Sequence, residues 1–154
     1  MLTTDEQREI TAEYPRYATK QGACLEALKI VQRRIGWVSD EDVKDVAAFL
    51  DMPYEELEGV ATFYNLVFRQ PVGKHVILIC DNVSCWITGY RSIRNTLITH
   101  LGIELGETTA DGRFTLLPIP CLGACDHAPA MMVGHDLHGD LQVDKIDAIL
   151  QQYE

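Results

Sequence analysis

The sequence has few basic residues: 13 Lys and Arg stand against 23 Asp and Glu, a formal net charge of -10 over 154 residues. The acidic excess is even, with 13 acidic and 8 basic side chains in residues 1–72 and 10 and 5 in residues 73–154. Binding to nucleic acid or to anionic lipid requires clustered Lys and Arg to neutralise phosphates. Neither half offers such a cluster, so we expect no nucleic-acid partner.

Long apolar segments, targeting signals and catalytic motifs are also missing. No apolar run approaches the roughly 18 residues of a membrane-spanning helix, and residues 1–20 are polar and acidic, unlike a signal or transit peptide. There is no Ser-His-Asp candidate, no glycine-rich nucleotide loop and no flavin-binding element. We therefore expect a cytoplasmic chain without membrane insertion, with reduced cysteines, that is not catalytic when isolated.

Residues 1–72 are predicted to form a helical subdomain. Apolar side chains in residues 23–35 recur at helical spacing. Ser39 is placed to cap a second helix, and Pro53 suits the first position of a third. The apolar segment 61–68 (ATFYNLVF) is expected to be core rather than docking surface.

Residues 73–154 are predicted to form a small sheet with helices against it, after a boundary at the breaker cluster 70–74 (QPVGK). Short apolar runs alternate here with helical stripes. The expected elements are strands at 75–80, 114–119 and 130–133, a short return strand at Leu137-His138, a helix at 85–101 and a last helix marked by Ile146, Ile149, Leu150 and Tyr153.

Some side chains in this second part carry expectations of their own. Trp86 is expected to pack inside as the start of the helical stripe, and the bond before Pro129 is expected to be trans. We expect His75 and His138 to lie at the surface, and His127 to contact solvent or a partner.

Four of the five cysteines form two pairs, each beginning where a predicted strand ends. The pairs are Cys80 with Cys85 (CDNVSC) and Cys121 with Cys125 (CLGAC), separated by 35 residues. Adjacent strand ends can bring four sulfurs together, and four thiolates in one place in a cytosolic protein indicate metal. The fifth, Cys24, lies on an apolar helix face and is expected to be a core thiol.

The spacing within the pairs bears on which metal is bound. Zinc sites usually use C-x₂-C, although spacings up to four occur. A [2Fe–2S] cluster spans two irons, each with two cysteines, and C-x₄-C is found in plant-type ferredoxins. The spacing therefore favours [2Fe–2S] over zinc, with unrelated buried or redox thiols as a third alternative. Asp81 and Asp126, which each follow a ligand, are expected to be solvated.

The cysteine pairs and their surroundings together make a specific combination. Set in HVILICDNVSCWITGY and TTADGRFTLLPIPCLGACDHAPAMMV, they resemble the thioredoxin-like [2Fe–2S] ferredoxin family. The segments ALKIVQRRIGWVS and EGVATFYNLVFRQPVG extend the resemblance, from about Tyr14 to Tyr153, to the small [2Fe–2S] subunits of bacterial NADH:quinone oxidoreductase, respiratory complex I. Gln142 departs from the pattern, because relatives often place Thr or Ser there to cap the last helix.

The resemblance implies an α/β fold, with an N-terminal helical bundle subdomain (1–72) followed by a thioredoxin-like [2Fe–2S] ferredoxin domain (73–154). It implies one low-potential [2Fe–2S] cluster, with Cys80, Cys85, Cys121 and Cys125 as its cofactor-binding and metal ligands. The implied function is electron transfer beside an FMN/NADH-binding subunit, with the large iron–sulfur subunit as a further partner. The implied location is the peripheral arm of the complex, on the cytoplasmic face of the inner membrane.

Three alternatives accompany this interpretation. Similar subunits serve as diaphorase components of NAD-linked hydrogenases and formate dehydrogenases, and one sequence does not separate these hosts. A zinc-stabilised adaptor would use the same four cysteines without redox activity. A free-standing ferredoxin is disfavoured, because a soluble shuttle has no need of an added helical subdomain.

Overall fold

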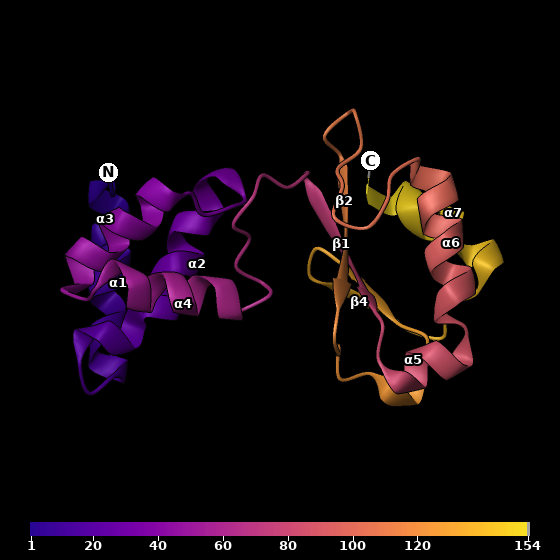
Figure 1. Ribbon diagram of the computed structural model, residues 1–154, viewed down its shortest axis with the longest axis horizontal. Helices are drawn as coiled ribbons and strands as arrows, with labels where there is room; N and C mark the ends of the chain where they lie inside the picture. Colours follow the sequence, from indigo (N-terminus) through magenta and orange to yellow (C-terminus); the bar gives the residue numbers. More distant parts are fainter. Residues whose placement is uncertain (154) are drawn as a thin grey trace. The chain divides into compact units, whose positions relative to one another are not determined.

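The computed structural model describes residues 1–153, which divide into two compact units, Met1–Pro71 and a second that begins at Val72 (Figure 1). Each unit has its own secondary-structure elements. None of the helices in residues 1–153 combines the length and apolar character that a membrane crossing requires.

The first unit is helical, as predicted. Within residues 1–71, its α-helices are α1 (Thr4–Glu13), α2 (Cys24–Ile35), α3 (Asp40–Leu50) and α4 (Tyr54–Phe63), with 3₁₀ turns η1 (Tyr14–Arg16) and η2 (Lys20–Ala23). One apolar cluster joins them, formed by Leu2, Ile10, Ala27, Leu28, Ile30, Val31, Val38, Val43, Val46, Ala47, Leu50, Leu57, Ala61 and Val67. Cys24 is half-buried and packs against this cluster, as expected for a thiol at the core.

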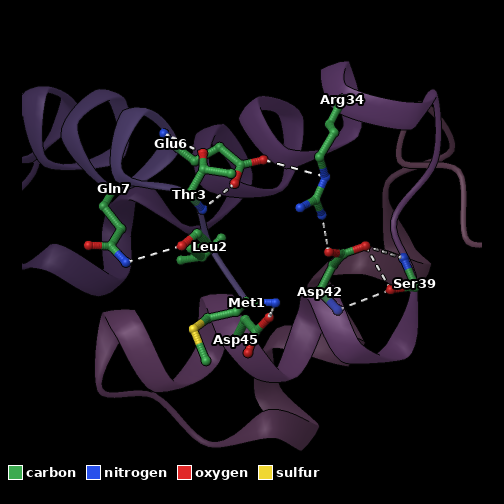
Figure 2. Close-up of polar contacts among 9 residues, drawn as sticks. All are labelled: Met1, Leu2, Thr3, Glu6, Gln7, Arg34, Ser39, Asp42 and Asp45. Carbon is green, nitrogen blue, oxygen red and sulfur yellow. Dashed lines mark hydrogen bonds and ion pairs between the residues drawn. The ribbon is translucent and has the colours of Figure 1, made fainter.

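Polar groups at the helix ends complete this unit (Figure 2). Ser39 caps α3 through a reciprocal pair of hydrogen bonds with Asp42, as the sequence predicted for its cap. Thr3 and Glu6 form the same capping box on α1, a helix that our prediction missed although its T-x-x-E start is a known signal. Arg34 lies between the two boxes and contacts both acidic members, Asp42 and, at 3.7 Å, Glu6.

The expectation that segment 61–68 is core is wrong for three of its five large side chains. Phe63 is 80% exposed, and Tyr64 and Leu66 are also exposed, while Ala61 and Val67 are buried. The helix ends at Phe63, so the following residues leave the helical register whose inner face meets the core. Pro53 is the N-cap of α4 rather than its first residue.

The second unit is built on a mixed sheet. Within residues 72–153, the strands are β1 (His75–Cys80), β2 (Phe114–Ile119), β3 (Met131–Val133) and β4 (Asp136–His138), in the order β2-β1-β3-β4. β1 pairs in parallel with β2, Cys80 lying opposite Ile119, and antiparallel with β3. The prediction of a strand buried on both faces is confirmed, since Val76 to Cys80 are all buried.

Three α-helices of this unit, α5 (Val83–Thr88), α6 (Tyr90–Leu101) and α7 (Ile146–Leu150), lie on the same side of the sheet (Figure 1). Tyr90, Ile93 and Leu97 form the predicted buried stripe. The remaining elements are the 3₁₀ turns η3 (Cys125–His127), η4 (Val143–Lys145) and η5 (Gln151–Tyr153). The predicted α/β fold, with a helical first part and a sheet in the second, is confirmed.

Four predictions about this unit are wrong. The helix expected at 85–101 is two helices, because Gly89 has a φ of 131°, outside the right-handed helical range. Trp86 lies before that break and is 47% exposed instead of packed inside. The Ala128–Pro129 bond is cis. His75 is half-buried rather than fully at the surface, because its ring packs against Phe114 and Tyr153. Burial is the largest cause of its lowered pKa.

Candidate metal centre

The first cysteine pair follows β1 directly. Cys80 is the last residue of β1 and is 4% exposed, and Cys85 lies in α5 and is 2% exposed. Asn82, between them, caps α5 by accepting a hydrogen bond from the Val83 N–H at 2.7 Å. A short strand-to-helix turn therefore brings two buried thiols to the carboxyl end of β1.

The second pair follows β2, whose carboxyl end lies at the same edge of the sheet because β1 and β2 are parallel. Cys121 comes two residues after Ile119, and Cys125 begins η3; both are exposed. Gly123, with a φ of 74°, turns the loop so that its N–H donates to the Cys121 sulfur at 3.3 Å. A side chain at this left-handed position would be strained.

The two segments are linked directly to each other. The Asn82 side-chain amide donates to the Pro120 carbonyl, 2.8 Å away, immediately before Cys121. Figure 1 shows α5 beside the segment that leaves β2, at one end of the sheet. The four sequence-predicted residues therefore share one edge, with Cys80 and Cys85 inside it and Cys121 and Cys125 on its surface.

Burial and the neighbouring thiols change the pKa of one cysteine at this edge. Burial, followed by interactions with the Cys80 thiol, raises the pKa of Cys85 to about 11, and Cys125 contributes to the same shift. Within residues 1–153, no group of three or more His, Cys, Asp or Glu side chains is close enough to hold a single metal ion. In a binuclear cluster, each of the two irons is bound by two cysteines, so the four sulfurs do not all bind one metal atom.

The residues present fit a [2Fe–2S] cluster. The donor set is four soft thiols, which is the ligand chemistry of iron–sulfur clusters. The Gly123 N–H donates to the Cys121 sulfur, the kind of hydrogen bond that tunes such clusters. Burial of Cys80 and Cys85 excludes water from one side of the site, while Cys121 and Cys125 leave the other side open.

Two acidic side chains and one histidine lie near the four cysteines along the chain. Asp81 and Asp126 are exposed, which agrees with the expectation of solvated carboxylates. His127 is exposed and lies between two carboxylates, Asp140 at 2.8 Å and Asp126 at 3.5 Å. The hydrogen bond to Asp140, with the charge of Asp126, raises the pKa of His127 above its usual value.

Trp86 lies one residue beyond Cys85, and its exposed ring contacts two neighbouring side chains. Its ring stacks on Tyr90 with centroids 5.5 Å apart, and the Arg91 guanidinium lies 4.6 Å above it. Two further apolar side chains of α5 are exposed, Val83 at 65% and Ile87 at 77%. The sequence did not predict this exposed apolar patch of Val83, Trp86 and Ile87. A single helix continued through Gly89 would place Trp86 on the buried face.

The family model for thioredoxin-like [2Fe–2S] ferredoxins matches residues 7–154. The E subunits of the NADH-quinone oxidoreductases of Pseudomonas aeruginosa and Escherichia coli K12 are each 47% identical to this chain over 153 residues. Each alignment covers 99% of this chain and 92% of the relative.

Among solved structures, an NAD⁺-reducing [NiFe]-hydrogenase chain is similar, with a TM-score of 0.71 and 25% identity. The match covers 84% of this chain but only 22% of the hydrogenase chain. The family and cofactor expected from the sequence are thereby confirmed. The chain belongs to the thioredoxin-like [2Fe–2S] ferredoxin family, and its cofactor is a [2Fe–2S] cluster.

Proposed function

We propose that this chain is the small electron-transfer subunit of an NADH-quinone oxidoreductase, with its cluster held by Cys80, Cys85, Cys121 and Cys125. One observation carries the proposal: relatives with that subunit's name match 99% of the chain at 47% identity. The gathering of four thiols at one sheet edge supports the ligand assignment. A [2Fe–2S] cluster with four cysteine ligands exchanges one electron at a potential on the order of -400 mV.

The residues of the chain prepare the site for such a group. Cys80 and Cys85 hold it from the buried side, and Cys121 and Cys125 hold it from the open side. The Gly123 N–H stabilises negative charge on a ligand sulfur. Because the second pair is exposed, an electron donor seated on this edge of the sheet approaches the cluster closely.

The donor in this proposal is the FMN/NADH-binding subunit of the complex, and the large iron–sulfur subunit is a further partner. The exposed apolar side chains of α5, Val83, Trp86 and Ile87, form a patch of the kind that marks protein interfaces. The patch lies on the same helix as Cys85, and Trp86 directly follows that cysteine, which supports docking of the flavin-bearing partner here. The assembled subunit would lie in the peripheral arm, on the cytoplasmic face of the inner membrane.

Co-expression with the FMN-binding subunit, followed by affinity capture, tests this function. We expect stable capture of the wild-type chain and at least about tenfold weaker capture of Trp86→Ala, since buried aromatic anchors dominate interfaces. Val143→Ser is the matched control, because Val143 is an equally exposed apolar residue on η4 and is expected to leave capture unchanged. Absence of capture with the wild-type chain would contradict the proposal.

A diaphorase subunit of an NAD-linked hydrogenase is the second candidate, and the hydrogenase likeness favours it over a formate dehydrogenase. Capture of hydrogenase subunits from the native cell, in place of the NADH-quinone oxidoreductase subunits, would support it. A zinc-stabilised adaptor is the candidate of another class, and a colourless protein with one zinc ion would support that function.

A further inference from the structure

The loop that carries Cys121 and Cys125 is anchored at both ends by side chains outside the ligand set. The first anchor is Asn82, whose amide donates to the Pro120 carbonyl at 2.8 Å while its oxygen accepts from the Val83 N–H. A carbonyl only accepts and an N–H only donates, so this pair of contacts fixes the orientation of the amide. One side chain thus joins the segment of the first cysteine pair to the start of the second.

The second anchor lies where the loop ends. The Asp140 N–H donates to the His127 carbonyl at 2.6 Å, and the His127 ring nitrogen Nδ1 is 2.8 Å from the Asp140 carboxylate. An ionised carboxylate only accepts, so the imidazole is the donor. Next along the chain, the Leu141 N–H donates to the Pro129 carbonyl at 3.1 Å, and Leu141 itself is buried.

The backbone around Asp140 shows how closely this anchor is built. Asp140 has a φ of 49°, in the left-handed range that few side chains adopt. At Gly139 an added Cβ would lie 2.5 Å from the His127 Cβ, so no larger residue fits without a shift. The segment 139–141 therefore lies directly against the residues that follow Cys125.

We propose that Asn82 and Asp140 are positioning residues for the [2Fe–2S] cluster, which hold the Cys121–Cys125 loop at its two ends. The inference rests on the proposed ligand set. Cys121 and Cys125 are exposed, so burial of the two cysteine side chains does little to fix them, and the two anchors supply that restraint. Residues that orient metal ligands in this way commonly alter metal affinity by about 10- to 100-fold when they are replaced.

Release of the cluster to an excess of iron chelator tests the two anchors separately. Asn82→Ser keeps a capping oxygen for α5 but removes the amide donor, and adds no charge. Asp140→Gly suits the left-handed backbone and removes the carboxylate. We expect each variant to release iron about three times faster than wild type and the double variant about ten times faster, since independent hydrogen bonds add in free energy.

Two control variants separate positioning from general destabilisation. Asp140→Asn keeps an oxygen that accepts the hydrogen bond from His127, so this variant is expected to release iron at the wild-type rate. Asp147→Asn breaks another exposed His–Asp pair of this unit, with His100 at 3.3 Å, and is expected to leave the rate unchanged. Asn82→Ser should also change the EPR line shape of the reduced cluster, because it shifts one cysteine pair relative to the other.

Wild-type release rates in both Asn82→Ser and Asp140→Gly would overturn the inference, as would equal acceleration by Asp147→Asn. Thermal melting of the loaded variants shows which of them are folded, and an unchanged line shape with a lowered melting temperature would count against positioning. A wild-type chain that binds no cluster would overturn the proposed function as well. If the wild-type chain binds the cluster and the anchor variants release iron at the same rate as wild type, only this inference is overturned.

Discussion

The two units of the chain differ in how their buried reactive groups are satisfied. In the helical unit, the buried carboxylates of Glu6 and Asp42 receive hydrogen bonds from Thr3 and Ser39 and share Arg34 (Figure 2). In the sheet unit, burial and then the neighbouring Cys80 thiol raise the pKa of the buried Cys85 to about 11. The buried charges of the first unit are paired by its own side chains, whereas the buried thiols of the second unit bind a metal cluster. Loss of the cluster should therefore destabilise the second unit and leave the first unit folded.

The largest expected effect comes from a ligand substitution. Cys85→Ser should abolish cluster binding and unfold the sheet unit while the helical unit stays folded, because a small core depends on its metal. Hydrogen–deuterium exchange resolved by segment measures this, with protection lost across β1 and β2 and kept across α2 and α3. Cys24→Ser is the matched control and should load the cluster normally. Full protection of β1 in Cys85→Ser would refute the difference between the units.

The reverse experiment removes packing from the helical unit. Leu28 is fully buried in α2, so Leu28→Ala should destabilise that unit by about 2–5 kcal/mol. Urea unfolding followed by far-UV circular dichroism measures the loss, and the visible absorption of the cluster should be unchanged. This test also bears on our proposal that residues 1–72 and 73–154 are separate domains. Loss of the cluster in step with the helices would contradict separate domains.

A smaller effect is expected at the Asp42 carboxylate. Burial disfavours its charge, but hydrogen bonds from Ser39 and the Arg34 guanidinium outweigh burial, so the pKa of Asp42 is lowered. Asp42→Asn should cost the helical unit about 1.5–3 kcal/mol near pH 7, the range for hydrogen bonds to charged groups. A lowered pKa stabilises the fold above the unfolded value of about 3.9 and ceases to do so as pH falls through the folded pKa.

Urea titrations of wild type and Asp42→Asn between pH 3 and 7 check that sign. The difference in unfolding free energy should be constant from pH 7 to about pH 5 and should shrink below about pH 4. A difference that grows on acidification would mean that Arg34 and Ser39 do not stabilise the ionised form.

The smallest effect concerns the cap before the last helix. Gln142 precedes η4 and makes no side-chain capping hydrogen bond. Gln142→Thr should stabilise the sheet unit by about 0.5–1 kcal/mol, because Thr is a good capping residue. The melting temperature of the loaded protein should rise by a few degrees. A fall would show that Gln142 has a role that its contacts do not reveal.

Elements with continuous apolar runs were predictable from the sequence. The strands at 75–80 and 114–119 have the predicted bounds, since short apolar runs leave a clear signal. Gly89 was not recognised as a helix break, because its backbone angle does not show in its identity. The exposure of Trp86 followed from that error, since a periodic stripe holds only within one helix.

The candidate site was predictable only in part. Paired cysteines at two strand ends carry a strong local signal, and the structure brings both strand ends to one edge. The anchors of the second loop were not predictable, because Asn82 and Pro120 are 38 residues apart and nothing local to either links them. The same holds for the pair of His127 and Asp140, which depends on how β3 and β4 return the chain.

The central claim is that four cysteines of the sheet unit hold one [2Fe–2S] cluster. Iron and acid-labile sulfide analysis of the purified chain, with EPR of the reduced protein, tests it most directly. We predict two irons and two sulfides per chain with a signal from one unpaired electron, all lost in Cys121→Ser and kept in Cys24→Ser. A protein that holds one zinc ion and gives no EPR signal on reduction would contradict the account.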